Sequence, residues 1–258
     1  IGCGIAGATA ALELAKDNQR LITLVTRSTP ADSNSSYAQG GIVSRGINDS
    51  KELLVKDVMA AGAGLSYLPA VKVLASAGPR WVKKLLIEEL GVDFDTNAKK
   101  HWDFGLEAAH STRRILHVAD ETGKAITFAL LSRLRTHKNI RLLTNHTAVD
   151  LITFPHHSQN PEDIYRPAAC YGAYLFDQKQ QKVKRMLAGA TILATGGVGQ
   201  LFLYTSNPPG ARGDGLAMAH RAGARIENAE YVQFHPTVLS MPGETKLLIS
   251  EAVRGEGG

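Results

Sequence analysis

The sequence predicts a doubly wound α/β fold that carries a β-rich insert, and three observations predict it. A glycine-rich turn, Gly2-Cys3-Gly4-Ile5-Ala6-Gly7, stands directly before an apolar stretch of helical composition. Short aliphatic runs then alternate with longer amphipathic stretches, as in parallel strands joined by helices. Two strand-like runs, 168–176 and 182–187, flank a polar turn and predict a hairpin within the insert.

The composition is that of an ordinary globular protein. Of 258 residues, 44% are hydrophobic and 21% charged, and the formal net charge is +5. No apolar stretch approaches the roughly 20 residues that cross a bilayer, so we expect no membrane span. Scattered Lys and Arg with only 6% aromatic residues argue against a nucleic-acid partner, whereas an acidic small molecule fits the charge. Cys3 and Cys170 form no CxxC pair, which predicts reduced thiols and a cytoplasmic location.

The first half of the chain predicts one βαβ half-unit followed by helices. A helix at 8–14 and a strand at 21–25 follow the glycine turn, and the stretch 28–41 is long and rich in small residues, as functional loops are. Helices are expected at 49–63 and 68–90. Proline removes a helical hydrogen bond, so we expect an interruption at Gly78-Pro79.

The second half adds further strands and helices. A short strand is expected at 92–95, followed by an irregular segment. The remaining predicted elements are a helix at 121–137, strands at 140–144, 148–154 and 190–194, and a helix at 213–223.

The glycine turn predicts a dinucleotide site. Glycines let a pyrophosphate approach the backbone, and the following helix N-terminus offers free N–H donors. About 20 residues further on, such sites normally carry an acidic residue for the ribose, but here Thr26 and Arg27 stand there. Arg27 fits either the extra phosphate of NADP or different contacts to the adenosine end of FAD, and the motif does not choose between them.

Other motifs have two interpretations when taken alone. The turn Ala194-Thr195-Gly196-Gly197 is either a second backbone approach to the cofactor or a strand-ending turn. The loop 35–41 offers donors for a phosphate or an isoalloxazine edge, yet a flexible loop has the same composition. His110 and His117 are spaced unlike common metal ligands, so no metal site is predicted. His235, before a proline, is either a turn residue or a catalytic group.

Seven motifs, taken in order, resemble the L-aspartate oxidases along essentially the whole chain. The wider family of that flavoenzyme includes the flavoprotein subunits of succinate dehydrogenase and fumarate reductase. The motifs are Tyr37-Ala38-Gln39-Gly40-Gly41, the run 110–117, Ala194-Thr195-Gly196-Gly197, Asn207-Pro208, Gly213-Asp214-Gly215, the run 233–237 and the run 251–257.

The resemblance implies an FAD site and its residues. In the reductases a histidine before the AQGG motif carries covalent flavin, whereas the matching residue here is Asn34, so FAD is expected to be noncovalent. Arg27 would lie near the adenosine. The implied cofactor contacts are Gly2, Cys3, Gly4, Ile5, Ala6, Gly7, Arg27, Asn34, Ser35, Ser36, Tyr37, Ala38, Gln39, Gly40, Gly41, Val149, Ala194, Thr195, Gly196, Gly197 and Asp214.

The resemblance also implies the reaction. L-Aspartate would be oxidised to iminoaspartate, with oxygen (giving H2O2) or fumarate as acceptor, and quinolinate synthase would take the product toward NAD. Glu107 would orient the substrate amino group, while His235, Ser250 and Arg254 would surround the dicarboxylate. The family has Gly-Gly after Glu107, where this chain has Ala108-Ala109. The arginine that acts as base is expected beyond Gly258.

For domain organisation, we expect an FAD-binding domain at 1–228 and the beginning of a substrate-capping α+β domain at 229–258. Both ends look cut, so we expect a piece of a longer protein that does not turn over aspartate by itself. Two alternatives stay open: a fumarate reductase or succinate dehydrogenase flavoprotein subunit, and an FAD-binding remnant without catalysis.

Overall fold

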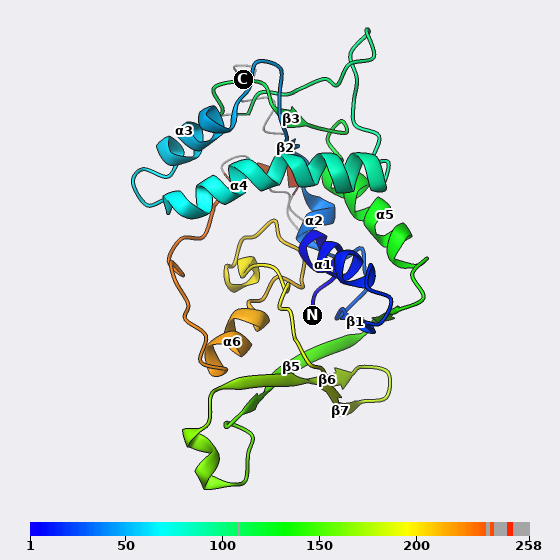
Figure 1. Ribbon diagram of the computed structural model, residues 1–258, viewed down its shortest axis with the longest axis vertical. Helices are drawn as coiled ribbons and strands as arrows, with labels where there is room; N and C mark the ends of the chain where they lie inside the picture. Colours follow the sequence, from blue (N-terminus) through cyan, green and yellow to red (C-terminus); the bar gives the residue numbers. More distant parts are fainter. Residues whose placement is uncertain (108, 236–237, 240–246, 250–258) are drawn as a thin grey trace. The chain divides into compact units, whose positions relative to one another are not determined.

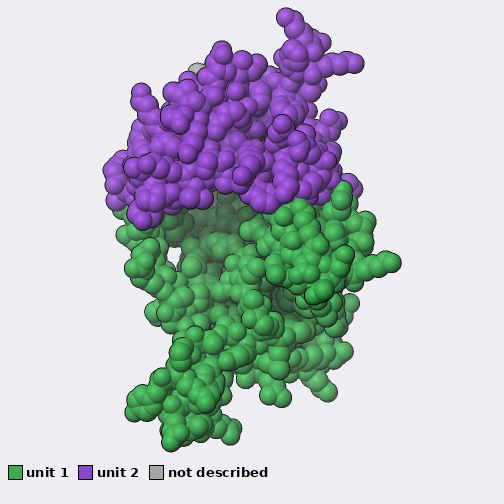
Figure 2. All heavy atoms as spheres, viewed as in Figure 1, with its two compact units in different colours: residues 1–35, 130–234 green, residues 36–129, 235–258 purple. Residues whose placement is uncertain are grey.

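The computed structural model describes residues 1–107, 109–235, 238–239 and 247–249. These residues form two compact units (Figure 2). The first unit contains Ile1–Ser35 and Leu130–Phe234, and the second contains the described parts of residues 36–129 and 235–258. No helix in the described ranges is long and apolar enough to cross a membrane.

The first unit is organised around a short parallel strand pair. Helix α1 (Ile5–Ala15) follows the glycine turn at once, and β1 (Ile22–Val25) pairs in parallel with β4 (Ile140–Leu143). The N–H of Gly2 donates to the carbonyl of Val25 at 2.8 Å, so the segment before α1 lies beside the end of β1. This arrangement of extended segment, glycine turn, helix and parallel strand confirms the predicted α/β class.

The β-rich insert is a three-stranded antiparallel sheet in the order β5-β6-β7 (Figure 1). Its strands are β5 (His146–Phe154), β6 (Ala169–Asp177) and β7 (Lys182–Leu187). The predicted hairpin is therefore confirmed, and β5 begins two residues before the predicted 148. A 3-10 helix, η2 (Pro161–Tyr165), lies in the connection between β5 and β6.

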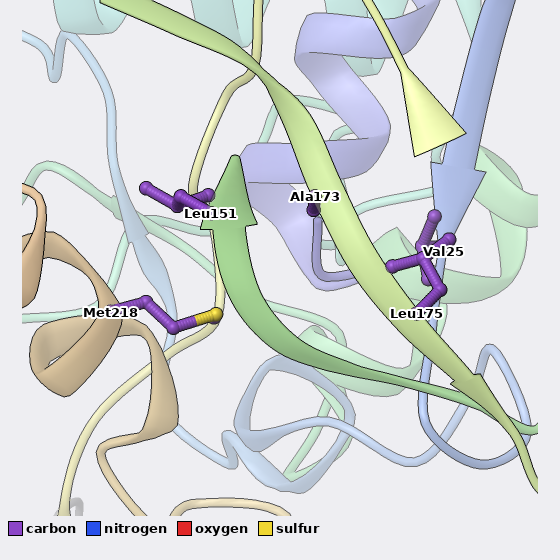
Figure 3. Close-up of a cluster of buried hydrophobic side chains, with 5 residues drawn as sticks. All are labelled: Val25, Leu151, Ala173, Leu175 and Met218. Carbon is purple, nitrogen blue, oxygen red and sulfur yellow. The ribbon is translucent and has the colours of Figure 1, made fainter. Parts of the chain in front are cut away.

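A hydrophobic cluster joins the insert to the rest of the first unit (Figure 3). Val25 of β1 and Met218 of α6 (Asp214–Arg221) meet side chains from two strands of the insert. Those strand residues are Leu151, Ala173 and Leu175. Burying an aliphatic side chain of this size stabilises a fold by roughly 1.5–3 kcal/mol. The cluster thus holds the insert and α6 at the end of β1, where the glycine turn lies.

The second unit contains three successive helices. These are α3 (Lys51–Ala61), α4 (Leu68–Trp81) and the π-helix η1 (Val82–Glu89). Two short antiparallel pairs, β2 (Ile42–Val43) with β3 (Ile115–Leu116) and β8 (Val238–Leu239) with β9 (Leu247–Leu248), were not predicted. Helices α2 (Asn34–Tyr37) and α5 (Thr122–Leu134) contain residues of both units, and the 3-10 helix η3 (Gly199–Leu201) belongs to the first unit.

The predicted interruption at Gly78-Pro79 is wrong, because α4 runs through it to Trp81. Pro79 has no N–H for the carbonyl of Ala75, the partner one turn earlier. Nη2 of Arg45 donates to that carbonyl instead, at 3.1 Å. A side chain from a distant loop therefore replaces the hydrogen bond that proline removes. After Trp81 the helix continues with the wider turns of η1.

Two predicted strands, 190–194 and 92–95, are not strands in the structure. The segment 190–194 is exposed or half-buried. Among the described residues its backbone bonds only to Ile1: the amino group of Ile1 donates to the carbonyl of Ile192, and Ala194 N donates to the carbonyl of Ile1. A ladder that short does not make a strand. Val92 and Phe94 are buried, so the apolar alternation at 92–95 reflects burial of loop residues rather than strand pairing.

Candidate functional site

Two of the three glycines of the opening turn, Gly2 and Gly7, stand where a side chain would collide with backbone, whereas a Cβ on Gly4 would lie 3.0 Å from Oγ of Ser35. Gly2 has a φ of +103°, and a Cβ there would lie 2.0 Å from the carbonyl oxygen of Ala194. A Cβ on Gly7 would lie 2.0 Å from the carbonyl oxygen of Gly2, so Gly7 lets α1 pack closely on the turn. Gly4 precedes α1 and supplies no side-chain cap, although Ile5 N donates to Oγ of Ser35 at 3.1 Å. The other N–H groups of the first helical turn have no acceptor within the helix, and such groups attract anions.

A pocket of about 280 Å³ opens at this turn within the first unit. The predicted cofactor residues on its wall are Gly2, Cys3, Gly4, Ile5, Ala6, Arg27, Asn34, Ser35, Ala194, Thr195, Gly196 and Asp214. The sequence did not predict wall residues from the start of the chain, β1, the loop after it, the start of β5, the segment before α6 and α6 itself. These are Ile1, Val25, Thr26, Ser28, Asp32, Ser33, His146, Thr147, Ala148, Pro208, Gly210, Ala211 and Met218. The sequence feature that could have predicted them is the carboxyl end of β1, because ligands bind at the carboxyl ends of parallel strands.

Arg27 and Asp214 lie together on the wall of this pocket. Nη1 of Arg27 is 3.7 Å from Oδ2 of Asp214, and Nη2 donates to the carbonyl of Pro209 at 2.8 Å. Nη1 is buried and has no hydrogen-bond partner among the described residues, so one donor of the guanidinium remains for a ligand. Gln178, in the β6–β7 turn, donates to the carbonyl of Arg27 at 2.8 Å. The insert thereby fixes the backbone that carries Arg27.

The Arg27–Asp214 pair bears on the choice between NADP and FAD. An extra phosphate on Arg27 would also meet the carboxylate of Asp214, and like charges at that separation repel. An adenosine end with free ribose hydroxyls has no such conflict. The pair therefore favours the FAD interpretation.

Other predicted cofactor residues of the first unit lie beside the pocket wall rather than on it. Gly7 is buried behind the turn, and the carbonyl of Gly197 accepts from Gly213 N at 3.1 Å. Val149 does not line the pocket and is 47% exposed, although its neighbour Ala148 does line it. Gly196 has a φ of +76°, so the turn after residue 194 does require glycine.

Residues 36–41 belong to the second unit, where Gly40 and Gly41 approach Glu107. Gly41 N donates to Oε1 of Glu107 at 3.1 Å, and a Cβ on Gly40 would lie 3.2 Å from the same oxygen. A Cβ on Gly41 would lie 2.4 Å from the carbonyl oxygen of Leu116 in β3, so this position also needs glycine. Within the second unit, the AQGG motif and the predicted substrate-orienting glutamate are thus in contact. The other residues of the stretch are Ser36, Tyr37, Ala38 and Gln39.

The remaining candidate substrate residues are only partly described. His235 is half-buried and lies in the second unit. Ser250, Arg254 and Ala108 lie outside the described residues. Within the described ranges, no group of His, Cys, Asp and Glu is arranged to hold a metal ion.

Cys3 lines the pocket as a neutral thiol. Its side chain is 5% exposed, and burial raises the pKa of the thiol to about 11. A protonated thiol is neither a nucleophile nor a second negative charge beside a pyrophosphate. Cys3 therefore contributes packing to the turn rather than chemistry.

A family model described as FAD binding domain matches residues 1–258, the whole chain. This chain belongs to the FAD binding domain family. FAD is accordingly the cofactor, and its pyrophosphate fits the glycine turn, which a Cβ at Gly2 or Gly7 would distort. The orphaned Nη1 of Arg27 supplies one further donor on the same wall.

Several relatives of this chain are named L-aspartate oxidase. This FAD binding domain is 43% identical over 262 residues to L-aspartate oxidase 1 of Ralstonia nicotianae, covering 100% of the chain and 47% of the relative. It is 42% identical over 258 residues to the L-aspartate oxidase of Nostoc sp., covering 100% and 42%. The chain thus spans less than half the length of these two relatives.

Solved structures confirm the fold of this FAD binding domain. The quinol fumarate reductase FrdA of E. coli superposes with a TM-score of 0.88 at 25% identity, covering 100% of this chain and 41% of that one. The Mycobacterium smegmatis Sdh1 complex superposes with a TM-score of 0.85 at 27% identity, covering 98% and 43%. These likenesses join the chain to the succinate dehydrogenase and fumarate reductase flavoproteins.

Proposed function

We propose that the whole protein is an FAD-dependent L-aspartate oxidase, the first enzyme of NAD biosynthesis. It oxidises L-aspartate to iminoaspartate and passes the two electrons to oxygen, giving H2O2, or to fumarate. The observation that carries the proposal is the Glu107 carboxylate held by the AQGG motif through Gly41, in a chain 43% identical to an L-aspartate oxidase. A cationic amino group calls for one such carboxylate.

Some residues of this chain bind the cofactor and others bind the substrate. The glycine turn and the N-terminus of α1 hold the pyrophosphate, Arg27 and Asp214 hold the adenosine side, and Asn34 and Ser35 continue the wall. FAD, when bound, supplies the acceptor for the hydride that leaves Cα of the substrate. An amide at Asn34 forms no covalent link to flavin, which supports noncovalent binding.

On the substrate side, Oε1 of Glu107 is engaged by Gly41 N, and Oε2 has no hydrogen-bond partner in the described part of the chain. Oε2 is the atom that we assign to the substrate ammonium group. We assign the two substrate carboxylates to His235, Ser250 and Arg254, since cationic and hydroxyl donors make the strong bonds to carboxylates. The first 228 residues then form the FAD domain, and residues 229–258 begin a cap that excludes water from the hydride step.

The experiment uses the full-length protein loaded with FAD and mixed anaerobically with L-aspartate, while the flavin absorbance is followed. Bleaching supports the proposal. Admitting oxygen or fumarate afterwards identifies the acceptor by the return of the absorbance.

A flavoprotein subunit of fumarate reductase or succinate dehydrogenase is the second candidate, because the E. coli quinol fumarate reductase superposes with a TM-score of 0.88. No bleaching with L-aspartate, followed by reoxidation of dithionite-reduced flavin by fumarate, would favour it. Neither response would favour a binding remnant without catalysis. Transfer of iminoaspartate to quinolinate synthase and a cytoplasmic location stay predictions, and the rice relative is named chloroplastic.

A further inference from the structure

A buried, charge-balanced network lies in the second unit beside Glu107. Arg114 is 0% exposed, and its guanidinium donates to Oδ2 of Asp57 at 2.6 Å and to Oδ1 of Asp49 at 2.9 Å. Arg45 lies 3.6 Å from the other oxygen of Asp49. The network therefore contains two guanidinium groups and two carboxylates, and their charges balance. Buried ions are stable only when they are paired in this way.

Asp57 connects this network to Ser111, which lies four residues after Glu107. Oδ2 of Asp57 accepts hydrogen bonds from both the N–H and the hydroxyl of Ser111, each at 3.0 Å. Burial alone would raise the pKa of Asp57, but these bonds and the Arg114 guanidinium outweigh it, so the pKa lies below the usual range. Asp57 thus stays ionised at neutral pH, and the backbone at Ser111 is fixed to α3.

The same guanidinium determines the hydrogen position on His110. Nη1 of Arg114 lies 3.1 Å from Nδ1 of His110. A guanidinium only donates hydrogen bonds, so Nδ1 must accept and cannot carry a proton. The single ring proton of His110 is therefore on Nε2.

His117 shows the opposite arrangement in the same unit. Its Nδ1 lies 3.0 Å from Oδ2 of Asp95, which only accepts, so this nitrogen must carry a proton. The two histidines of the run 110–117 therefore differ at Nδ1. In His110 this nitrogen accepts from Arg114, and in His117 it donates to Asp95.

His110 and Glu107 are joined directly. The backbone N–H of His110 donates to the carbonyl of Glu107 at 3.0 Å, so the two residues share one turn. Nε2 of His110 and Oε2 of Glu107 have no hydrogen-bond partner among the described residues. The turn therefore offers one negatively charged acceptor and one neutral donor.

We propose that Arg114 is a positioning residue that locks His110 as a neutral Nε2–H donor, so that Glu107 and His110 together bind the ammonium and one carboxylate of an α-amino acid. This inference rests on the proposed function. The donor complements a carboxylate and the acceptor complements an ammonium group, so the pair selects a zwitterion over a plain dicarboxylate such as succinate.

The first test is ¹⁵N NMR of the full-length protein labelled at the histidine ring nitrogens, with the His110 signals assigned by their loss in His110→Gln. We expect a bare Nδ1 and a protonated Nε2 at neutral pH, and the reverse pattern or an imidazolium would overturn the proposal. In Arg114→Lys we expect the His110 signals to shift, whereas Arg113→Lys, at the exposed neighbouring arginine, leaves them unchanged. Unchanged signals in Arg114→Lys would overturn the positioning role.

The second test separates binding from chemistry. In His110→Leu the KM for L-aspartate is expected to rise about tenfold, the loss of one hydrogen bond, at unchanged FAD content. His110→Gln keeps an N–H donor and should recover most of that loss. An unchanged KM in His110→Leu would overturn the ligand assignment. Wild-type protein that shows the expected ring pattern but no bleaching with L-aspartate would overturn the proposed function and leave the hydrogen position of His110 established.

Discussion

The carboxylate of Glu107 accepts a hydrogen bond from the backbone N–H of Gly41, with 3.1 Å between Oε1 and N. A motif expected to contact flavin and a residue expected to contact substrate are therefore joined within one unit. The bond fixes one carboxylate oxygen and leaves the other available. Rigidity of this kind holds a substrate in a reactive orientation.

Replacing Glu107 by Gln should therefore reduce activity without loss of cofactor. We expect kcat/KM for L-aspartate to fall by about 10- to 100-fold, because a charge-assisted bond of roughly 1.5–3 kcal/mol is lost. Steady-state kinetics and the flavin-to-protein absorbance ratio measure the two quantities. Glu121→Gln is the matched control, since Glu121 is a largely exposed glutamate of the same unit paired with Lys124. An equal loss in both variants would contradict the assigned role.

Adding one methyl group at Gly7 should disrupt the cofactor turn. A Cβ there would lie 2.0 Å from the carbonyl oxygen of Gly2, so the turn must move, and overpacking of this kind costs about 1–3 kcal/mol. Gly7→Ala is expected to lower the melting temperature and the FAD content of the purified protein. Gly189→Ala, with open space at the Cβ position, should change neither. Full FAD occupancy in Gly7→Ala would show that the turn tolerates the change.

Asp177 should make the insert sensitive to acid. Its carboxylate accepts from the N–H groups of Gln180 and Lys179 and pairs with Lys184, and these contacts lower its pKa to about 2. A lowered pKa in the folded state stabilises the fold above the unfolded value of about 3.9, and this contribution is lost as pH falls toward 2. Urea unfolding between pH 5 and pH 2 should therefore show a steeper loss of stability for wild type than for Asp177→Asn. Parallel curves would contradict the assignment.

Arg45 and Pro79 should behave as a coupled pair. Arg45→Met leaves the carbonyl of Ala75 without a donor and should lower the free energy of unfolding by about 1–3 kcal/mol. Pro79→Ala restores an N–H at the position that bonds Ala75 in a regular helix. In the Pro79→Ala background, Arg45→Met should then cost less, as a double-mutant cycle measures. Additive effects would mean that the Arg45 bond does not compensate for the proline.

The amino-acid sequence alone determined those features of the protein that depend only on residues close together in the chain. The glycine turn, α1, the β6–β7 hairpin and the need for glycine at Gly196 follow from backbone freedom and hydrophobic period, which act over a few residues. The cofactor class followed from the same turn together with the order of motifs along the chain.

The tertiary structure alone determined the contacts and the pocket wall that residues far apart in the chain form together. It supplied Arg45 to the carbonyl that Pro79 leaves unpaired, brought the start of β5 to the wall of the cofactor pocket, and placed Asp49 and Asp57 around Arg114. It also left the segment 190–194 without a strand partner long enough to form a ladder. The physical reason is that a hydrogen-bond partner or a buried charge pair has no signature in local spacing, because its energy exists only once distant segments meet.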